Sequence, residues 1–273
     1  MANIAVLGGG RIAEALISGL IEAGADPRKI RVTNRSAERG KELRETYGVM
    51  DLRDNTQAVD GADFAFICLK PDAVVSVLNE VSDTLEDNDH TTTVVSMAAG
   101  VSLSTLEDTL SAGTPILRVM PNTPMLLGAG MSAIAPGRFA HEEHIEAVKE
   151  LLETVGEVMV IKESKMDAVT ALSGSAPAYF FLMAEALTDA GVALGLDRES
   201  AAVLSAASIH GAGVMLRESG DSAVELRANV SSPAGTTVAA IQAFEEAGIR
   251  SAFYEATQAC VRRAEALGQE NAE

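Results

Sequence analysis

The sequence contains no tryptophan, only two cysteines and no long apolar run. Two cysteines cannot form a disulfide framework, and Cys68 and Cys260 fall in different expected elements, so we expect both thiols to be reduced. Glycine or charged residues interrupt the apolar stretches, and the first ten residues lack the basic start of a signal peptide. We therefore expect no transmembrane segment and a cytoplasmic protein.

Basic residues are scarce: 21 lysines and arginines stand against 39 acidic residues, which gives a net charge of −18. A balance this acidic disfavours binding to nucleic acid. The acidic residues are spread over expected helix faces, such as 142–153, and form no single tail. We expect an acidic, solvated surface whose charge a high-salt cytoplasm would screen, and hence a halophilic source such as a halophilic archaeon.

The first glycines follow a short apolar run and lead directly into a helical pattern. Ile4–Leu7 has the composition of a strand, and apolar residues recur at helical spacing from Arg11 onward. Gly8 and Gly10 take the first two positions of the dinucleotide-binding fingerprint, and Ala13 takes the third, where the helix packs on the strand. The stretch predicts a pyrophosphate site at the start of the helix.

The residues after the second expected strand, 29–33, bear on the choice of cofactor. An NAD site places Asp or Glu there to hold the ribose 2′-hydroxyl, whereas this chain has Asn34, Arg35 and Ser36. An acid would repel a 2′-phosphate, whereas an arginine fork and a hydroxyl bind one. The pattern therefore favours NADP(H). Ser36 is also the expected N-cap of the next helix, 37–46, and the two roles are compatible.

The rest of the pattern divides the chain, which is long enough for two domains, into a mixed part and a helical part. Further strands are expected at 63–69, 93–96, 115–119, 131–135 and 157–161, with an acidic helix at 141–154. Beyond residue 162 we expect only helices, including 178–194, 198–218 and 250–267. The prediction is an α/β fold, with a Rossmann-type, mostly parallel sheet domain at 1–162 and an all-α domain at 163–273.

Three segments after expected strands are candidate cofactor contacts. Lys70 follows a buried strand, at the edge where open α/β sheets bind ligands, although a solvated lysine at a turn is the alternative. The small residues of Met97–Gly100 leave room for a flat ring. Pro121 and Pro124 stiffen the next loop, which suits either a cover over a cofactor or merely a rigid connection.

Two small-residue turns in the helical part each lead into a helix. Leu172–Tyr179 places a proline in the first turn of its helix, and Val230–Thr237 precedes an expected helix at 238–247. Exposed N–H groups beside hydroxyls in the second turn form a ready carboxylate site, although each turn, considered alone, is better explained as an ordinary helix cap. His141 and His144 lack the spacing of the zinc-protease motif, and we expect no metal site.

Taken in order, these motifs resemble those of the pyrroline-5-carboxylate reductases over nearly the full length of the chain. The resemblance rests on the stretches Gly8–Ala13, Asn34–Ser36, Lys70–Pro71, Ser96–Gly100, Arg118–Pro124, Leu172–Ser175 and Ser231–Thr237. The last stretch is the most specific, because related Rossmann reductases are not expected to carry it. Ala176 and Ala234 stand where the family usually has glycine, and either alanine would be strained if its φ were positive.

The resemblance implies an N-terminal NAD(P)-binding domain, a helical dimerisation domain, and an active site that uses both subunits of a homodimer. Many members assemble further, into a decamer of five dimers. The implied reaction is the last step of proline biosynthesis: hydride transfer from NADPH to the C=N bond of 1-pyrroline-5-carboxylate, a small cyclic imine with a carboxylate, giving L-proline. It needs no metal, and NADH is left open as a second cofactor.

The resemblance also implies site residues by position. Those implied to bind the cofactor are Leu7, Gly8, Gly9, Gly10, Arg11, Ile12, Asn34, Arg35, Ser36, Asn55, Cys68, Leu69, Lys70, Pro71, Met97, Ala98 and Ala99. Those implied to bind the substrate are Ser232, Gly235, Thr236 and Thr237. The Thr237 hydroxyl would hydrogen-bond near the ring nitrogen and is the candidate catalytic contact.

Other two-domain Rossmann reductases with a helical second domain remain alternatives, namely β-hydroxyacid dehydrogenase-like enzymes and deazaflavin-dependent NADP oxidoreductases. The first group would place a lysine in the first long helix of the second domain, whereas Lys162 and Lys165 precede that helix here. A non-catalytic NADP-binding sensor with the same fold is a third alternative. The two hydroxyl-rich turns argue against a sensor.

Overall fold

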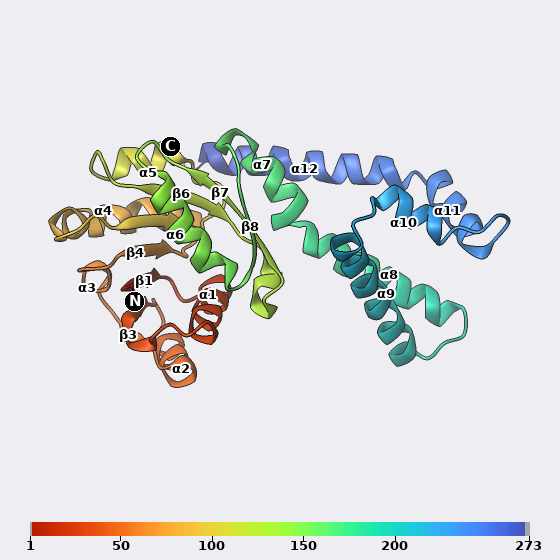
Figure 1. The fold of residues 1–273 in the computed structure, drawn as a ribbon, viewed down its shortest axis with the longest axis horizontal. Helices are drawn as coiled ribbons and strands as arrows, with labels where there is room; N and C mark the ends of the chain where they lie inside the picture. The colour runs from red at the N-terminus through yellow and green to blue at the C-terminus, as the bar shows by residue number, and fades with distance from the viewer. Residues whose placement is uncertain (1, 271–273) are drawn as a thin grey trace. The chain divides into compact units, whose positions relative to one another are not determined.

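The computed structural model describes residues 2–270 (Figure 1). They form two compact units: unit 1 comprises the chain up to Ser175 and the segment from Cys260 onward, and unit 2 is Ala176–Ala259. The predicted domain boundary, between residues 162 and 163, falls earlier than this division. Met166 is fully buried in a core cluster of unit 1, so the first residues after that boundary pack with the sheet. The boundary itself stays a prediction.

Unit 1 is built on one eight-stranded sheet with the order β3-β2-β1-β4-β5-β6-β7-β8. The strands are β1 (Ile4–Leu7), β2 (Ile30–Thr33), β3 (Met50–Leu52), β4 (Phe64–Ile67), β5 (Thr93–Ser96), β6 (Ile116–Met120), β7 (Gly130–Pro136) and β8 (Gly156–Val160). Only the β6–β7 pair is antiparallel among these described strands. The chain winds outward from β1 in both directions, so the crevice for a ligand is expected at the carboxyl ends of the central strands.

Helices of unit 1 cover both faces of the sheet (Figure 1). They are α1 (Arg11–Glu22), α2 (Ala37–Tyr47), α3 (Asn55–Val59), α4 (Pro71–Asp87), α5 (Leu103–Thr109), α6 (Glu142–Glu153) and α7 (Met166–Val169), with short 3₁₀ turns η1 (Pro27–Lys29), η2 (Thr123–Leu127) and η3 (Glu163–Lys165). A parallel sheet covered on both faces requires strands that are apolar throughout, which explains the continuous apolar runs in the sequence.

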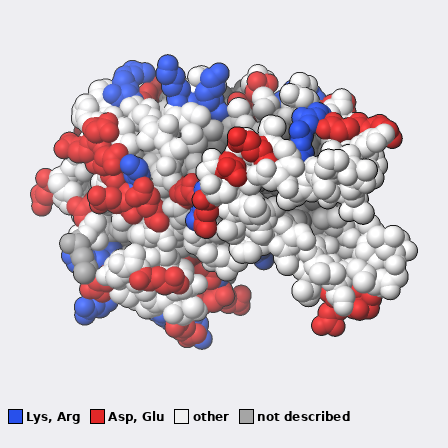
Figure 2. Space-filling model, turned by 45° about the vertical axis from the view of Figure 1, so that its right-hand side comes forward, with Lys and Arg blue, Asp and Glu red and all other residues white. Residues whose placement is uncertain are grey.

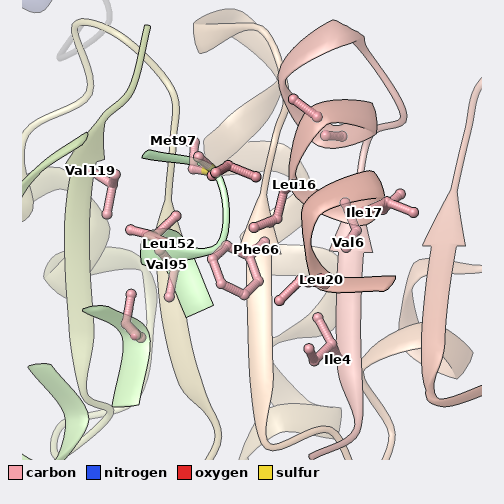
Figure 3. Close-up of a cluster of buried hydrophobic side chains, with 14 of the residues drawn as sticks. Ile4, Val6, Leu16, Ile17, Leu20, Phe66, Val95, Met97, Val119 and Leu152 are labelled. Carbon is pink, nitrogen blue, oxygen red and sulfur yellow. The ribbon is translucent and has the colours of Figure 1, made fainter. Parts of the chain in front are cut away.

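The core of unit 1 consists of two apolar clusters, one on each face of the sheet. Alternate residues of β1 supply them: Val6 belongs to the cluster with α1 and α6, and Leu7 to the cluster with α3, α4 and α5. Figure 3 shows Leu16 and Ile17 of α1 above the strands, with Phe66 of β4 beside them. Phe66 is fully buried. This packing fixes the end of β1 and the start of α1, between which the glycine turn lies.

Unit 2 is helical throughout. Its elements are α8 (Ala176–Ala193), α9 (Arg198–Glu218), α10 (Ala223–Asn229), α11 (Thr236–Glu246) and the first part of α12 (Ile249–Glu270), whose second part belongs to unit 1. Phe181, Leu182, Val203 and Leu204 each expose more than half of their surface in the single chain. An apolar surface of this extent on one unit is typical of a protein–protein interface.

The two points at which the chain leaves and re-enters unit 1 lie next to each other. Ser175 is the last residue before unit 2, and Cys260 is the first after it. The Cys260 thiol donates a hydrogen bond to the Ser175 hydroxyl at 3.4 Å. Unit 2 is therefore an insertion within the chain of unit 1.

The predicted mostly parallel sheet, helical second part and long helices are confirmed, each helix to within a few residues. The short elements β3, α3, α5 and α10 were not predicted. Two predicted turns differ from the structure: residues 170–174 form a π-helical turn, η4 (Thr170–Gly174), and α11 begins at Thr236 instead of Val238. None of the helices in residues 2–270 is both long and apolar enough to cross a membrane.

Candidate functional site

The turn between β1 and α1 requires glycine for two separate reasons. Gly8 has φ +95°, and a Cβ on it would lie 2.6 Å from the Cys68 carbonyl oxygen. Its N–H donates to the Thr33 carbonyl at 3.1 Å, which fixes the turn over the end of β2. Gly10 is the N-cap of α1 and brings no side-chain cap. The first N–H groups of α1 are therefore open to an anion.

Arg39 of α2 holds this turn in place. Its Nε donates to the Gly9 carbonyl at 2.7 Å, and its Nη2 pairs with Glu14 of α1 at 2.6 Å. Tyr47 also donates to Glu14, at 3.1 Å. Partial burial acts to lower the Arg39 pKa, but the hydrogen bonds that Arg39 donates to Glu42 and Glu14 outweigh it, so the pKa is raised and the guanidinium stays charged. Sequence reasoning missed Arg39, whose role depends on how α1 and α2 pack.

A pocket of about 380 Å³ lies in front of the turn, at the carboxyl edge of the sheet. Its lining residues are Gly8, Gly9, Gly10, Asn34, Arg35, Ser36, Arg39, Cys68, Leu69, Lys70, Asp72 and Ala73. A second pocket of about 170 Å³ shares part of this wall and adds Thr33, Arg53, Asn55 and Val77. Ten of the residues implied to bind the cofactor thus line one continuous region, although they come from four separate stretches of sequence.

The other residues implied to bind the cofactor do not line these two pockets. Leu7 is fully buried, and Arg11, Ile12 and Pro71 occupy the first turns of α1 and α4. Met97 and Ala98 are buried behind the end of β5, while Ala99 is exposed. The Cys68 thiol lies 3.6 Å from the Met97 sulfur. For these residues the cofactor assignment stays a prediction.

Two polar side chains at this edge are buried without a partner among the described residues. They are the Asn34 Nδ2, after β2, and the Ser96 Oγ, at the end of β5. A Cβ on Gly9 would lie 2.1 Å from the Asn34 Oδ1, so the asparagine fills the space beneath the turn. Buried polar atoms normally find a hydrogen-bond partner. The orphaned Asn34 amide therefore fits a polar ligand seated on the glycine turn, as a dinucleotide would be.

Two of the residues that line the pocket, Ser36 and Lys70, also lie at the N-cap of a helix. Ser36 caps α2 by accepting a hydrogen bond from the Arg39 N–H at 3.4 Å, and Lys70 is the N-cap residue of α4. Burial raises the pKa of the Cys68 thiol to about 12. A thiol with such a pKa stays protonated near neutral pH and is no nucleophile.

The second hydroxyl-rich segment, in unit 2, forms a tight turn followed by a helix. The Gly235 N–H donates to the Ser232 carbonyl at 2.9 Å, with Pro233 and Ala234 between them. Ala234 has φ +56° and is the only described non-glycine residue with positive φ. Proline followed by a residue with positive φ is the layout of a type II turn, which prefers glycine at the second position. The expected strain is therefore present at Ala234.

Gly235 is the N-cap of α11 and carries no side-chain cap, so the first N–H groups of this eleven-residue helix are open. A Cβ on Gly235 would lie 2.4 Å from the Ser232 Oγ and 2.9 Å from the Ser232 carbonyl oxygen, and the contact with the backbone oxygen explains the need for glycine. Thr236 and Thr237 lie in the first turn of α11, so the predicted helix start at Val238 is wrong. The threonines and the open N–H groups occupy the same turn, and this turn suits a carboxylate.

The first hydroxyl-rich segment is the π-helical turn η4, in unit 1. The Ser175 N–H donates to the Thr170 carbonyl at 2.8 Å, which closes the wide turn. Asn122 ties it to the proline-rich loop: its Nδ2 donates to both the Ser173 carbonyl and the Ser173 Oγ at 3.3 Å. Ala176 begins α8 and has no positive φ, so no strain arises there. π-helical turns are rare and frequently lie at functional sites.

Two of the histidines, His141 and His144, have a local structural role at the start of α6. His141 is the N-cap of α6, and its backbone N–H donates to the His144 Nδ1 at 3.0 Å. Across residues 2–270 there is no group of three or more His, Cys, Asp or Glu side chains placed to hold a metal ion.

Comparisons with known proteins match both units. A family model described as pyrroline-5-carboxylate reductase dimerisation matches residues 163–267, and one described as NADP oxidoreductase coenzyme F420-dependent matches residues 3–100. The chain is 57% identical to the pyrroline-5-carboxylate reductase of Corynebacterium melassecola, over 98% of this chain and 100% of the relative.

Solved structures agree. A pyrroline-5-carboxylate reductase from Coxiella burnetii matches with a TM-score of 0.92 and 36% identity, over 97% of this chain and 98% of that one. The pyrroline carboxylate reductase of Plasmodium falciparum with NADP bound matches with a TM-score of 0.87 and 27% identity, over 98% of both chains.

Proposed function

The chain belongs to the pyrroline-5-carboxylate reductase family, and from that premise we propose which of its residues carry the reaction. It is an NAD(P)-dependent oxidoreductase of proline biosynthesis that reduces the C=N bond of 1-pyrroline-5-carboxylate with NADPH, and it forms a homo-oligomer. Which side chains hold the cofactor and the substrate is the proposal. Its single strongest support is the orphaned Asn34 amide beneath an uncapped glycine turn.

We assign the pyrophosphate of NADPH to the open N–H groups at the start of α1, and its 2′-phosphate to the segment after β2. Arg39 keeps the turn rigid through the Gly9 carbonyl. Arg35 and Ser36 line the pocket beside Asn34 and supply the charge and hydroxyl that a 2′-phosphate needs. When bound, NADPH supplies the hydride that reduces the imine carbon.

The substrate carboxylate is assigned to the first turn of α11. The uncapped N–H groups after Gly235 carry the positive end of the helix dipole, which favours an anion there. Thr237 lies in the same turn, and its hydroxyl hydrogen-bonds near the ring nitrogen of a substrate held in this way. Because the imine nitrogen can arrive protonated, the chain mainly has to position its substrate, and positioning can lower a barrier by several kcal/mol.

The test is NADPH oxidation at 340 nm with 1-pyrroline-5-carboxylate, for the wild type and three threonine variants. We expect Thr237→Ala to lower kcat about tenfold or more with an unchanged NADPH Kd, because one substrate hydrogen bond is lost. Thr237→Ser keeps the hydroxyl and should retain most of the rate. Thr257→Ala is the matched control, because the Thr257 hydroxyl is half-buried on α12 and bonds only to the Phe253 and Tyr254 carbonyls of its own helix among the described residues. An unchanged kcat in Thr237→Ala would remove this residue from the mechanism.

We further propose a cytoplasmic enzyme adapted to high salt, assembled as a dimer and, above that, as a decamer of five dimers. The exposed apolar side chains of unit 2 support an extensive interface. Acidic side chains are distributed over the face drawn in Figure 2, in line with the net charge of −18. Light scattering would separate the mass of two chains from that of ten. Full stability in dilute buffer would contradict the salt adaptation.

A further inference from the structure

Two arginines leave neighbouring strands at the same edge of the sheet. β2 and β3 are parallel, with Thr33 opposite Leu52 in the register. Arg35 follows the first strand by two residues and Arg53 follows the second by one. Both line the 170 Å³ pocket next to the glycine turn. The pairing of the two strands brings the two guanidinium groups to one pocket, although the two residues are distant in sequence.

Arg53 is held toward the segment that follows β2. Its Nη1 donates to the Asn34 carbonyl at 3.3 Å, and the other four N–H groups of this fork have no partner among the described residues. The neighbouring carboxylate of Asp54 is occupied elsewhere, because it caps α3 by accepting from the Thr56 N–H at 2.9 Å. Arg35 is exposed and makes no ion pair or hydrogen bond within residues 2–270.

The small pocket has no carboxylate in its lining, although the chain as a whole has 39 acidic residues against 21 basic ones. Two acids lie beside it: Glu80 accepts from the Asn55 Nδ2 at 3.0 Å, and Asp72 lines the adjoining 380 Å³ pocket. Two guanidinium groups that make no ion pair with a described acid give this pocket a local positive field in an acidic protein. Such a field suits a compact dianion, and a guanidinium fork matches the oxygen geometry of a phosphate.

We propose that Arg53 is a second specificity-determining residue, which binds the 2′-phosphate of NADP(H) together with Arg35. The proposal rests on the cofactor site assigned above and adds to it a residue that follows a different strand. The bond to the Asn34 carbonyl holds the Arg53 fork beside the segment that carries Arg35. A ligand without a 2′-phosphate gains nothing from Arg53, so this residue separates NADP(H) from NAD(H).

Binding of the cofactor and its fragments tests this without relying on turnover. Isothermal titration calorimetry would give the Kd of adenosine 2′,5′-bisphosphate, 5′-AMP, NADPH and NADH for the wild type, Arg53→Ala, Arg53→Lys, Arg35→Ala and Arg44→Ala. Arg44 is an exposed arginine of α2 that lines neither pocket, so its removal controls for the loss of one positive charge. Thermal unfolding of each variant confirms that it is folded.

We expect Arg53→Ala to weaken NADPH and the bisphosphate about tenfold, as for one charge-assisted hydrogen-bond partner, and to leave NADH and 5′-AMP within about twofold. Arg53→Lys keeps the charge but not the fork, so its affinity for NADPH and for the bisphosphate should lie between those of the wild type and Arg53→Ala. Arg44→Ala should match the wild type. The gap between the bisphosphate and 5′-AMP should narrow as salt rises, because screening weakens the ionic contacts.

The other outcomes overturn the proposal in distinguishable ways. If Arg35→Ala loses affinity for the bisphosphate and Arg53→Ala does not, the cofactor site stands and the role of Arg53 is wrong. If Arg53→Ala binds NADPH and NADH more weakly by the same factor, Arg53 does not contact the 2′-phosphate and only supports the conformation of the Asn34 segment. If neither arginine matters, the 2′-phosphate binds elsewhere, and the assignment of Asn34–Ser36 fails as well.

Discussion

Ala234 is held in a backbone conformation that glycine adopts without strain, and replacing it with glycine should stabilise the protein. Its φ of +56° costs an L-residue about 1–2 kcal/mol. Glycine removes this cost but adds about 0.4–1 kcal/mol of chain entropy to the unfolded state. The side chain of Ala234 is exposed, so no packing is lost. We therefore expect Ala234→Gly to raise the free energy of unfolding by about 0.5–1 kcal/mol.

The matched control is the other alanine at a position where the family usually has glycine. Ala176 is the first residue of α8, has no positive φ and is 9% exposed. Glycine there lowers helix propensity and removes a buried methyl group, so Ala176→Gly should lose about 0.5–1 kcal/mol. The same substitution at two sites should thus change stability in opposite directions.

Differential scanning calorimetry at one protein concentration and one salt concentration measures both effects, because assembly makes Tm depend on concentration. For a chain of this size we expect Tm to rise by about 1–3 °C in Ala234→Gly and to fall by a similar amount in Ala176→Gly. A fall in both variants would refute the reasoning. It would mean that at Ala234 the chain entropy that glycine adds to the unfolded state outweighs the backbone strain that it removes.

Three further outcomes follow from contacts in unit 1. Arg118, buried on β6, pairs with Glu163 at 3.0 Å. Arg118→Ala would leave that half-buried carboxylate without its cation, with only the Leu103 N–H still donating to it, and should cost about 1–2 kcal/mol in urea unfolding; an unchanged urea midpoint would contradict this. Because burial raises the Cys68 pKa to about 12, almost none of this thiol is ionised at pH 8, and mass spectrometry should find Cys68 unmodified after iodoacetamide treatment of the native protein. Arg39→Ala should weaken NADPH and NADH alike, in contrast to Arg53→Ala, because Arg39 holds the Gly9 carbonyl; selective loss of NADPH would assign Arg39 to the 2′-phosphate instead.

The elements that the sequence predicted are those with a continuous apolar run or a long helical segment between clear caps. β5 and α9 occur at the predicted residues, because β5 is an apolar run and α9 is a long alanine-rich segment that begins after the Asp197 cap. β3 has three residues and α3 has five, too few for any period to be visible. The start of α11 was placed two residues late, although Gly235 after Pro233 was a usable signal for a cap.

The candidate site was predictable where local chemistry defines it and not where packing does. The glycine turn and Asn34–Ser36 were found because their backbone and charge requirements lie within one short stretch. Arg53 was missed because its place in the pocket depends on the pairing of β2 with β3, and the sequence of β3 is too short to predict this pairing. The sign of φ at Ala234 was left open for a similar reason: composition permits the turn, and only the folded segment sets its angle.

The insertion of unit 2 between Ser175 and Cys260 has a consequence for how the protein is made. All eight strands of unit 1 leave the ribosome before any residue of unit 2, so the sheet can form early. The last segment of unit 1, from Cys260 onward, follows only after every helix of unit 2 has been synthesised. Completion of the first unit therefore waits for the second, and a chain whose synthesis stops within unit 2 carries a nucleotide-binding sheet that lacks its final helix.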